Sequence, residues 1–513
     1  MKRPIALSIS LISLLASPAY AAVDLSPEKQ EALKNTLTKY IEGLQGNNVN
    51  AGGTLLGYNF DGDIKISKGD GFFKVALPFM TYNAPDGSHF NVGQIAINAT
   101  PLKEQGQWAM ALSIPKIMTK VDTNETPVQI ITIGSQEFGG VFHEEFQNFT
   151  KLKANYADIA VKSPKNNIDA KISKLSLIHD LNENETGVLS GIMNYALENA
   201  TTTMNGVPIF GANSLSIKGN IEGMDISKTS SAQNKMMSSQ QTIQNNEETA
   251  KTFLEAMTSM YFEASKSFDV TFAANDILMN PPVQGLVFPE GERRFEYANF
   301  SFGLENTDNN LSNAKLGLNY AVPKIDEDTN PVAAQESLLP QKVDLAIGLN
   351  NLPAYELITD QINQPPQSVL TPENERRKPV ETIVGYLVDA NTQLNINTIS
   401  LNGIDYAGSL EGSLQADAES VIKFTADLDM KLSGLGNLVE RLGNVPATSP
   451  SAGTIENLLM PLGILQMIGQ QTGDGDTRAY NFEVTKTGQL TLNGADLSTI
   501  LGAGVMQQSP FLQ

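Results

Sequence analysis

The stretch LNINTISLNGIDYAGSLEGSLQADAESVIKFTADLDMKLSGLGNLVERL, residues 394–442, contains the pattern from which the rest of the chain can be understood. In its last strand-like run, Leu428, Met430 and Leu432 occupy every second position, with charged residues between them. A period of two is typical of a strand with one buried face. After Gly434 the apolar residues follow helical spacing instead. We therefore predict strands followed by a short amphipathic helix that folds back on the sheet.

An earlier part of the chain repeats this unit. Val343–Ile347 followed by Gly348 matches Leu428–Leu432 followed by Gly434, with one inserted residue before the second glycine. The copies are 85 residues apart (428 minus 343). Because glycine reaches positive φ without steric cost, we predict that both glycines occupy the turn between strand and helix. The two copies should then be equivalent units, each delivering a helix to the same face of a sheet.

Alternation with a period of two also dominates residues 54–227, for example at Phe73, Val75, Leu77 and Phe79. Along this region the period of two with polar intervening residues indicates antiparallel sheets with one wet face rather than a parallel α/β sheet. The expected fold is α+β and β-dominated. It consists of long twisted antiparallel sheets with amphipathic helices packed on one face and the repeated strand–Gly–helix unit.

Helical spacing appears in shorter segments. Ser26 followed by Pro27 and Glu28 is a typical helix start, and apolar residues then recur at helical spacing. The same spacing predicts helices over residues 189–200, 247–266, 380–387 and 455–469. The face of 247–266 is rich in Met and aromatic residues, a composition more typical of core packing than of a ligand surface.

These patterns predict four regions. Residues 1–21 form a signal peptide, and residues 22–230 form an N-terminal helix followed by a β-rich domain. Residues 231–266 contain a linker and an amphipathic helix, since the stretch before the helix is rich in Ser, Gln, Asn and Met. Residues 267–513 form a C-terminal β-rich domain with the strand–helix repeats.

The first residues predict export. Lys2 and Arg3 precede the apolar run Ile5–Leu15, and Ala19-Tyr20-Ala21 completes a small-residue cleavage site, with cleavage expected after Ala21 or Ala22. The apolar run is too short to span a bilayer, and no later stretch predicts a transmembrane anchor. An exported chain without cysteine fits the periplasm of a Gram-negative bacterium.

The charge balance bears on partners. The chain contains 56 Asp and Glu against 35 Lys and Arg, a net charge of -21. Such a protein repels nucleic acid and anionic headgroups on average, so we expect no nucleic-acid partner. A cationic partner would suit the acidity, but solubility alone also explains it.

Metal-binding motifs are incomplete. His143-Glu144-Glu145 is similar to the start of a zinc-protease helix, but Gln147 stands where the second histidine is needed. Residues 180–185 imitate the start of a calcium loop, but a glutamate replaces the glycine that the loop requires. His89 and His179 are expected to be surface residues. We therefore expect no metal site and no cofactor.

Motifs for nucleophilic catalysis are also partial. Lys486-Thr487-Gly488 matches one element of serine β-lactamases, and Ser113–Lys116 and Ser420–Lys423 have the spacing of their nucleophile motif. Both serines lie in strand patterns, whereas that nucleophile opens a helix. Because no nucleophile–base pair can be named, we expect no catalytic residues and a protein that is not an enzyme. An uncharacterised hydrolase is the third alternative for its function.

The segment Gly488–Ser498 resembles the ending of YdgA-like proteins, an uncharacterised bacterial envelope family, and Val343–Ile358 is similar to another part of that family. The resemblance covers the C-terminal half. Those proteins commonly keep an uncleaved anchor, whereas this chain has Ala19-Tyr20-Ala21. In the general character of its sequence the chain also resembles AsmA-like envelope proteins, which use long curved sheets with an apolar inner face. That resemblance implies lipid handling. Neither resemblance supplies catalytic residues.

Two main functions remain. The first is non-enzymatic binding or transfer of an apolar ligand, such as a lipid or acyl chain, in a groove formed by a curved sheet and covered by helices such as 247–266 or 455–469. The second is a structural or protein-interaction module of the envelope, with sheets filled by their own side chains. Leu, Ile, Met and Phe on an inner face suit both functions.

Overall fold

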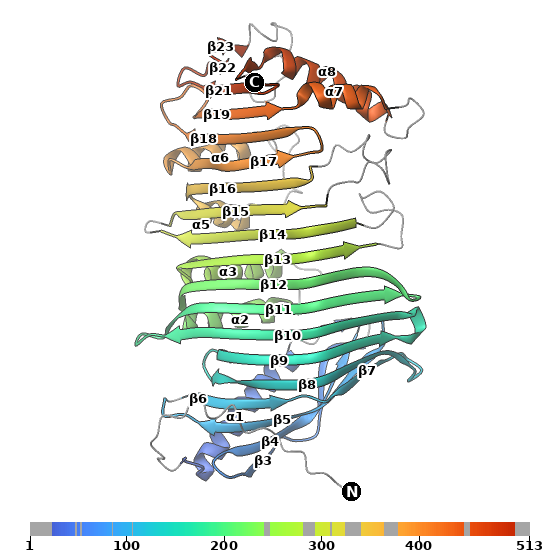
Figure 1. Ribbon diagram of the computed structural model, residues 1–513. Coiled ribbons are helices and arrows are strands. Elements are labelled where there is room, and N and C mark those ends of the chain that lie inside the picture. The colour runs from blue at the N-terminus through green and yellow to red at the C-terminus, as the bar shows by residue number, and fades with distance from the viewer. Residues whose placement is uncertain are drawn as a thin grey trace. The chain divides into compact units, whose positions relative to one another are not determined.

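The chain forms two compact units, Met1–Ala264 (unit 1) and Ser265–Gln513 (unit 2). The computed structural model describes residues 23–46, 49–51, 54–84, 86–104, 106–240, 247–280, 293–307, 310–323, 340–363, 378–445, 452–473 and 475–497. The predicted signal peptide lies outside the described residues. Antiparallel strands dominate both units (Figure 1), as the alternation of apolar and polar residues predicts.

Unit 1 begins with helix α1 (Pro27–Gly46) and ends with helices α2 (Ile226–Gln240) and α3 (Glu247–Thr258). Between them lie β1 (Val49–Ala51), β2 (Thr54–Asp61), β3 (Lys65–Lys68), β4 (Phe73–Asn83), β5 (His89–Pro101), β6 (Gln107–Ser113), β7 (Ile117–Val121), β8 (Pro127–His143), β9 (Asn148–Ser163), β10 (Ile168–Glu183), β11 (Val188–Met204) and β12 (Val207–Asp225). From β8 to β12 each strand pairs antiparallel with the next. Both β6 and β7 pair with β5 and with β8.

Helix α1 starts as its sequence predicts. The Ser26 hydroxyl accepts a hydrogen bond from the Lys29 amide at 3.3 Å, which caps the helix, and Pro27 is its first residue. Leu33, Leu37 and Ile41 are buried on the inner face of the helix. They pack in one cluster with buried residues of the first strands: Phe73, Val75, Leu77, Ile97, Ala99, Trp108, Met110 and Phe142. This cluster is the core of the N-terminal part of unit 1.

The helix predicted over residues 189–200 is wrong, because this segment belongs to strand β11. The apolar residues on its inner face have odd numbers up to Leu197 and even numbers from Ala200 onward. This change produces a spacing of three residues, which imitates a helix. Asn199, between Leu197 and Ala200, adopts the left-handed conformation with φ of 49°. A single residue of this kind in a strand changes which positions share a face, and the sequence pattern alone does not reveal it.

The same interruption crosses five strands. The strand registers of β8 to β12 skip one position at the same level in each strand. The skipped residues are Gly134, Asp158, Ser173, Asn199 and Asn213. Asp158 is also left-handed, with φ of 53°. In β10 the exposed residues have odd numbers up to Ser173 and even numbers from Ile178 to Asn182. The interruption therefore lets apolar residues on both sides of it share one face.

We predict that the hairpin near Asp86 loses its carboxylate hydrogen bonds only in strong acid. Asp86 accepts hydrogen bonds from the Ser88 hydroxyl, from Lys120 Nζ at 3.1 Å and from the Ser88 amide at 3.0 Å. These bonds lower the pKa of Asp86 from 3.8 to about 2. Because the folded pKa is the lower one, this stabilisation is present above the unfolded value and is lost as pH falls through about 2.

An NMR titration of the Asp86 carboxyl carbon measures this directly. Its midpoint should be about 2, and Ser88→Ala should move it toward 3.8, because the Ser88 hydroxyl is the largest cause of the shift. An Asp86 midpoint near 3.8 in the unmodified protein would contradict the hydrogen bonds described here.

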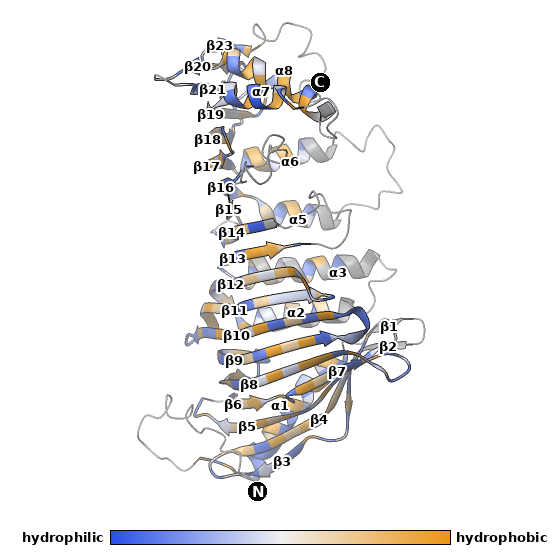
Figure 2. Ribbon diagram, turned by 45° about the vertical axis from the view of Figure 1, so that its right-hand side comes forward, coloured by the Kyte–Doolittle hydropathy of each residue, from blue (hydrophilic) through white to orange (hydrophobic). Residues whose placement is uncertain are grey.

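Unit 2 is also built of antiparallel strands. Its strands are β13 (Ser267–Met279), β14 (Arg293–Asn306), β15 (Ser312–Ala321), β16 (Lys342–Leu352), β17 (Gln393–Asn402), β18 (Ala407–Ala416), β19 (Phe424–Ser433), β20 (Gln470–Gln471), β21 (Arg478–Val484), β22 (Leu490–Leu492) and β23 (Ala495–Asp496). From β13 to β19 each strand pairs with the next, and β19 pairs with β21. Its helices are α5 (Ala354–Asn363), α6 (Lys378–Asp389), α7 (Leu435–Gly443) and α8 (Ala452–Ile468). Figure 2 shows these helices on one side of the unit 2 sheet.

The two glycines of the repeated unit differ. Gly434 precedes α7 directly and has φ of 74°, as predicted for a turn. Gly348 does not occupy a turn, because β16 continues through it to Leu352 and its φ is not positive. The predicted turn at Gly348 is therefore wrong. The residue that adopts positive φ near the end of β16 is Asn351, at 55°.

Candidate functional site

One face of the unit 2 sheet is apolar across eight strands, β13 to β19 and β21. Directly paired residues of neighbouring strands lie on the same face of a sheet, so the registers define rows that cross the strands. The first row is Phe272, Phe300, Leu318, Leu345, Ile399, Leu410, Met430 and Tyr480. Every strand thus contributes a large apolar or aromatic side chain to this row.

Three parallel rows extend this surface. The second is Val270, Phe302, Leu316, Ile347, Ile396, Gly412, Leu428 and Phe482, and the third is Phe268, Leu304, Ala314, Leu349, Leu394, Leu414, Ala426 and Val484. The fourth is Ala274, Ala298, Tyr320, Val343, Leu401, Gly408, Leu432 and Arg478. We call these four rows the apolar face. Its one charged residue is Arg478.

The opposite face of the same strands is polar. A row between the second and third apolar rows is Asp269, Gly303, Lys315, Gly348, Asn395, Ser413, Asp427 and Glu483. On this face the Asn481 amide donates to both Asp427 and Asp429 at 3.1 Å. Polar groups that bond to one another and to water explain why this side needs no cover.

Part of the apolar face is open to solvent. Among the residues that β13 to β15 contribute to the apolar face, five with large side chains remain 36–45% exposed. They are Phe272, Phe300, Phe302, Leu316 and Leu318. The rings of Phe272 and Phe300 are 6.1 Å apart, so they contact each other across the strands. We call these five residues the exposed patch. A contiguous exposed apolar surface of this kind marks an interaction or ligand site more often than chance.

At β21 the apolar face is covered. Tyr480 is buried, and its hydroxyl donates to the Leu465 carbonyl of α8 at 2.7 Å. Burial raises the pKa of Tyr480 above 10, so the hydroxyl remains a donor. Helix α8 packs in turn on α7 through Ile455, which clusters with Leu438 and Leu442. Helices α7 and α8 therefore close one end of the apolar face.

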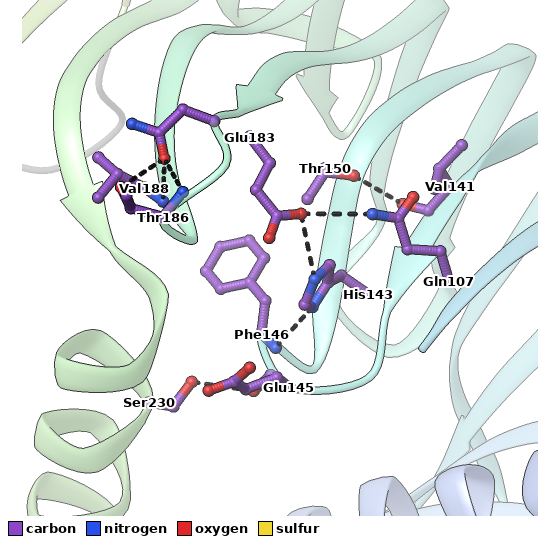
Figure 3. A network of polar contacts seen from close by, with 11 residues as sticks. Gln107, Val141, His143, Glu145, Phe146, Thr150, Glu183, Thr186, Val188 and Ser230 are labelled. Atoms are coloured by element: carbon purple, nitrogen blue, oxygen red, sulfur yellow. Dashed lines mark hydrogen bonds and ion pairs between the residues drawn. The ribbon is translucent and has the colours of Figure 1, made fainter. Parts of the chain in front are cut away.

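In unit 1 the predicted zinc-like motif has a structural role (Figure 3). His143 is buried at the end of β8, where its Nδ1 accepts the Phe146 amide at 3.2 Å. The proton is then on Nε2, which faces Glu183 Oε2 at 3.3 Å. The Gln107 side chain donates to the same oxygen at 3.3 Å. His143 thus holds a turn to the end of β10, and no second histidine approaches it.

The next two residues of that motif connect helices to the sheet. Glu144 accepts hydrogen bonds from Trp108 Nε1 at 2.7 Å and from the Thr36 hydroxyl of α1 at 2.8 Å. The Glu145 carbonyl accepts the Ser230 hydroxyl of α2 at 2.9 Å. The segment His143-Glu144-Glu145 is therefore an anchoring point for α1 and α2.

His179 was predicted to be a surface residue, and this prediction is wrong. The side chain is buried within β10. Its Nδ1 lies 3.0 Å from the Phe149 carbonyl and its Nε2 lies 2.7 Å from the Tyr195 hydroxyl. Since a carbonyl only accepts, Nδ1 carries the proton and Nε2 accepts from Tyr195. His89 is half-buried, and its Nε2 lies 3.7 Å from Glu125.

The calcium-like sequence at 180–185 is already occupied by protein groups. Lys151 pairs with Asp180 and donates to Asn182 at 2.7 Å. Asn184 instead accepts the amide of Val188 at 2.9 Å, which closes a hairpin turn. The described residues contain no group of three side chains that could hold a metal ion.

The serine–lysine motifs have other roles. Ser420 is buried and donates to the Phe424 carbonyl at 2.8 Å, while Lys423 donates to the Ala418 carbonyl. Lys486 pairs with Glu419 at 2.6 Å and with Asp417, and these hydrogen bonds raise its pKa, so it is held as a cation rather than a base. These contacts give Ser420, Lys423 and Lys486 a structural role in the loops that they connect.

No known protein family, no curated protein and no solved structure matches the chain. The resemblance to YdgA-like and AsmA-like proteins therefore stays a prediction. Within the described residues, no helix is both long enough and apolar enough to cross a membrane. The fold defines the class instead, a β-dominated protein whose unit 2 sheet has one polar and one apolar face.

Proposed function

We propose that the protein is a non-enzymatic protein of the bacterial envelope that binds or transfers an apolar ligand, such as a lipid or acyl chain. The observation that carries the proposal is the apolar face of unit 2, continuous over eight strands and exposed over β13 to β15. Export to the periplasm is part of the proposal and rests on the N-terminal sequence.

The dimensions of the apolar face suit an acyl chain. The seven strands β13 to β19, which lie beyond the end covered by α7 and α8, are about 4.8 Å apart and cover roughly 29 Å. An acyl chain in one leaflet covers about 15 Å, half of the roughly 30 Å hydrocarbon core of a bilayer. A whole chain can therefore lie across the strands, and contact with leucine and phenylalanine side chains would stabilise it by about 25 cal/mol for each Å² removed from water.

We expect purified protein mixed with extracted envelope lipids to retain stoichiometric lipid in native mass spectrometry. Leu316→Gln should weaken the binding by roughly tenfold, because burial of a leucine side chain contributes about 1.5 kcal/mol or more. Leu316 is itself partly exposed, so the substitution should change the stability of the fold little.

Lys315→Gln is the matched control, because Lys315 precedes Leu316 in β15 and lies on the polar face. It should leave lipid binding unchanged. Absence of lipid adducts from the unmodified protein, together with a melting temperature that is constant across a lipid titration, would refute the proposal.

A protein-interaction module is the second candidate, and helix α8 favours it. Met460, Ile464 and Met467 are spaced along one side of α8, and all three are exposed. An exposed apolar stripe on a helix can contact another protein. If lipid adducts are absent, this stripe is the surface that the second candidate would use.

A further inference from the structure

We infer that the ligand of the apolar face is an amphiphile with an anionic head, a carboxylate or a phosphate, and that Arg478 of β21 binds this head. The inference rests on the proposed function and goes beyond it by naming the ligand class. Arg478 ends the fourth apolar row, next to Leu432 of β19. It is the one charged residue among the four rows, so a charged head has one partner on this face.

The guanidinium of Arg478 has a donor without a protein partner. Its Nε is buried and makes no hydrogen bond. The neighbouring carboxylate of Asp476 instead accepts the Gly436 amide at 3.1 Å. Arg441 shows the contrast, since its guanidinium makes two hydrogen bonds to Asp405, at 2.8 and 3.0 Å. Because a buried donor without a hydrogen-bond partner destabilises a protein, Arg478 is a site where a bound acceptor stabilises the fold.

The chemistry of Arg478 selects the head. A guanidinium presents N–H donors in a planar fork that matches carboxylate and phosphate oxygens, and it is weakly hydrated. From Arg478 the fourth row continues through Leu432 and Leu401, both half-buried, toward the exposed patch, and these side chains receive the tail. The chain's net charge of -21 discourages binding of anions that lack a tail. An alkyl chain with an anionic head satisfies both parts of this surface.

A purely structural role for Arg478 predicts something different. The residue lies beside Gly469, just after the end of α8, where a cation interacts favourably with the last helix carbonyls. In that case its removal would lower stability but would not change which ligands bind. The two roles are therefore separated by ligand selectivity.

The experiment compares palmitate, hexadecyl phosphate and hexadecanol as ligands of the full chain by isothermal titration calorimetry. The three share one alkyl tail and differ in the head. The unmodified protein should bind both anions more tightly than the alcohol. Arg478→Gln should weaken the anions by roughly 10- to 100-fold, the range of a charge-assisted hydrogen bond, and leave hexadecanol unchanged. The anion that loses more affinity identifies the head.

Two further variants complete the test. Lys431→Gln removes a cation from the neighbouring strand on the opposite face and should change no affinity, because Lys431 pairs with Ala479. Arg478→Lys should restore part of the anion binding. Equal weakening of all three ligands by Arg478→Gln, or no change in any, would overturn the inference while the proposed function stands. If the unmodified protein binds none of the three, the proposed function fails with it.

Discussion

Replacing Gly434 by alanine is expected to lower the free energy of unfolding by about 2–6 kcal/mol, which is the sum of backbone strain and overpacking. Gly434 has φ of 74°, a conformation that costs other residues free energy. An added Cβ would also overlap the Asp405 carbonyl oxygen and lie close to Tyr406. The clash involves backbone atoms, so no side-chain rotation relieves it.

Gly348→Ala is the matched control for this prediction. Gly348 occupies the equivalent place in the sequence repeat, yet the nearest atom to an added Cβ is Asn397 Nδ2 at 3.8 Å, an ordinary contact distance. Its substitution should change stability by less than roughly 1 kcal/mol, and removal of backbone freedom from the unfolded chain favours the folded state.

Urea denaturation gives the change in free energy, and hydrogen exchange localises it. Amides of α7 should lose protection in Gly434→Ala before amides of β8 to β12 do, since the turn orients α7 directly. Equal stability of the two alanine variants would show that Gly434 needs no special conformation.

The comparison of these glycines shows what a local pattern can predict. The alternation of Leu428, Met430 and Leu432 correctly predicts half-buried positions, since a strand repeats every two residues whatever its partners are. Gly348 fits the same pattern but lies in a strand that extends four residues further. Where a strand ends depends on hydrogen bonds to its neighbours, and those are non-local.

Residues 189–200 show how local patterns fail inside a strand. The left-handed Asn199 shifts the apolar positions by one, and the resulting spacing imitates a helix. Each strand from β8 to β12 has an interruption at the same level. This shared interruption can be recognised only when the strand registers are known. The feature of the sequence that indicates such an interruption is an Asn or Asp at the interrupted position, because these residues tolerate positive φ better than most others.

Arg478 could not be predicted from the sequence for a related reason. Its neighbours in β21 indicate only an alternating strand. That it stands alone among apolar residues becomes visible when eight strands, separated by up to about two hundred residues, are placed in register. His179 was missed similarly, because its partners Phe149 and Tyr195 lie on other strands.

Replacing Leu33 by alanine is expected to destabilise unit 1 by about 2–5 kcal/mol, the range for deletion of a fully buried leucine side chain. Leu33 has no exposed surface and packs in the cluster that α1 forms with Phe73 and Trp108. The cavity left by the substitution would lie between a helix and a sheet whose backbone is fixed by strand pairing, so little collapse can fill it.

The single tryptophan of the chain makes this measurable. Trp108 is buried in the same cluster and donates to Glu144, so its fluorescence reports the unfolding of the α1 core. Urea titrations followed at this residue should show a lower midpoint for Leu33→Ala, whereas Lys34→Ala, at the adjacent exposed position, should stay within about 0.5 kcal/mol of the unmodified protein. Equal midpoints for the two variants would mean that α1 does not pack against these strands in solution, and the core of unit 1 would have to be assigned to the sheet alone.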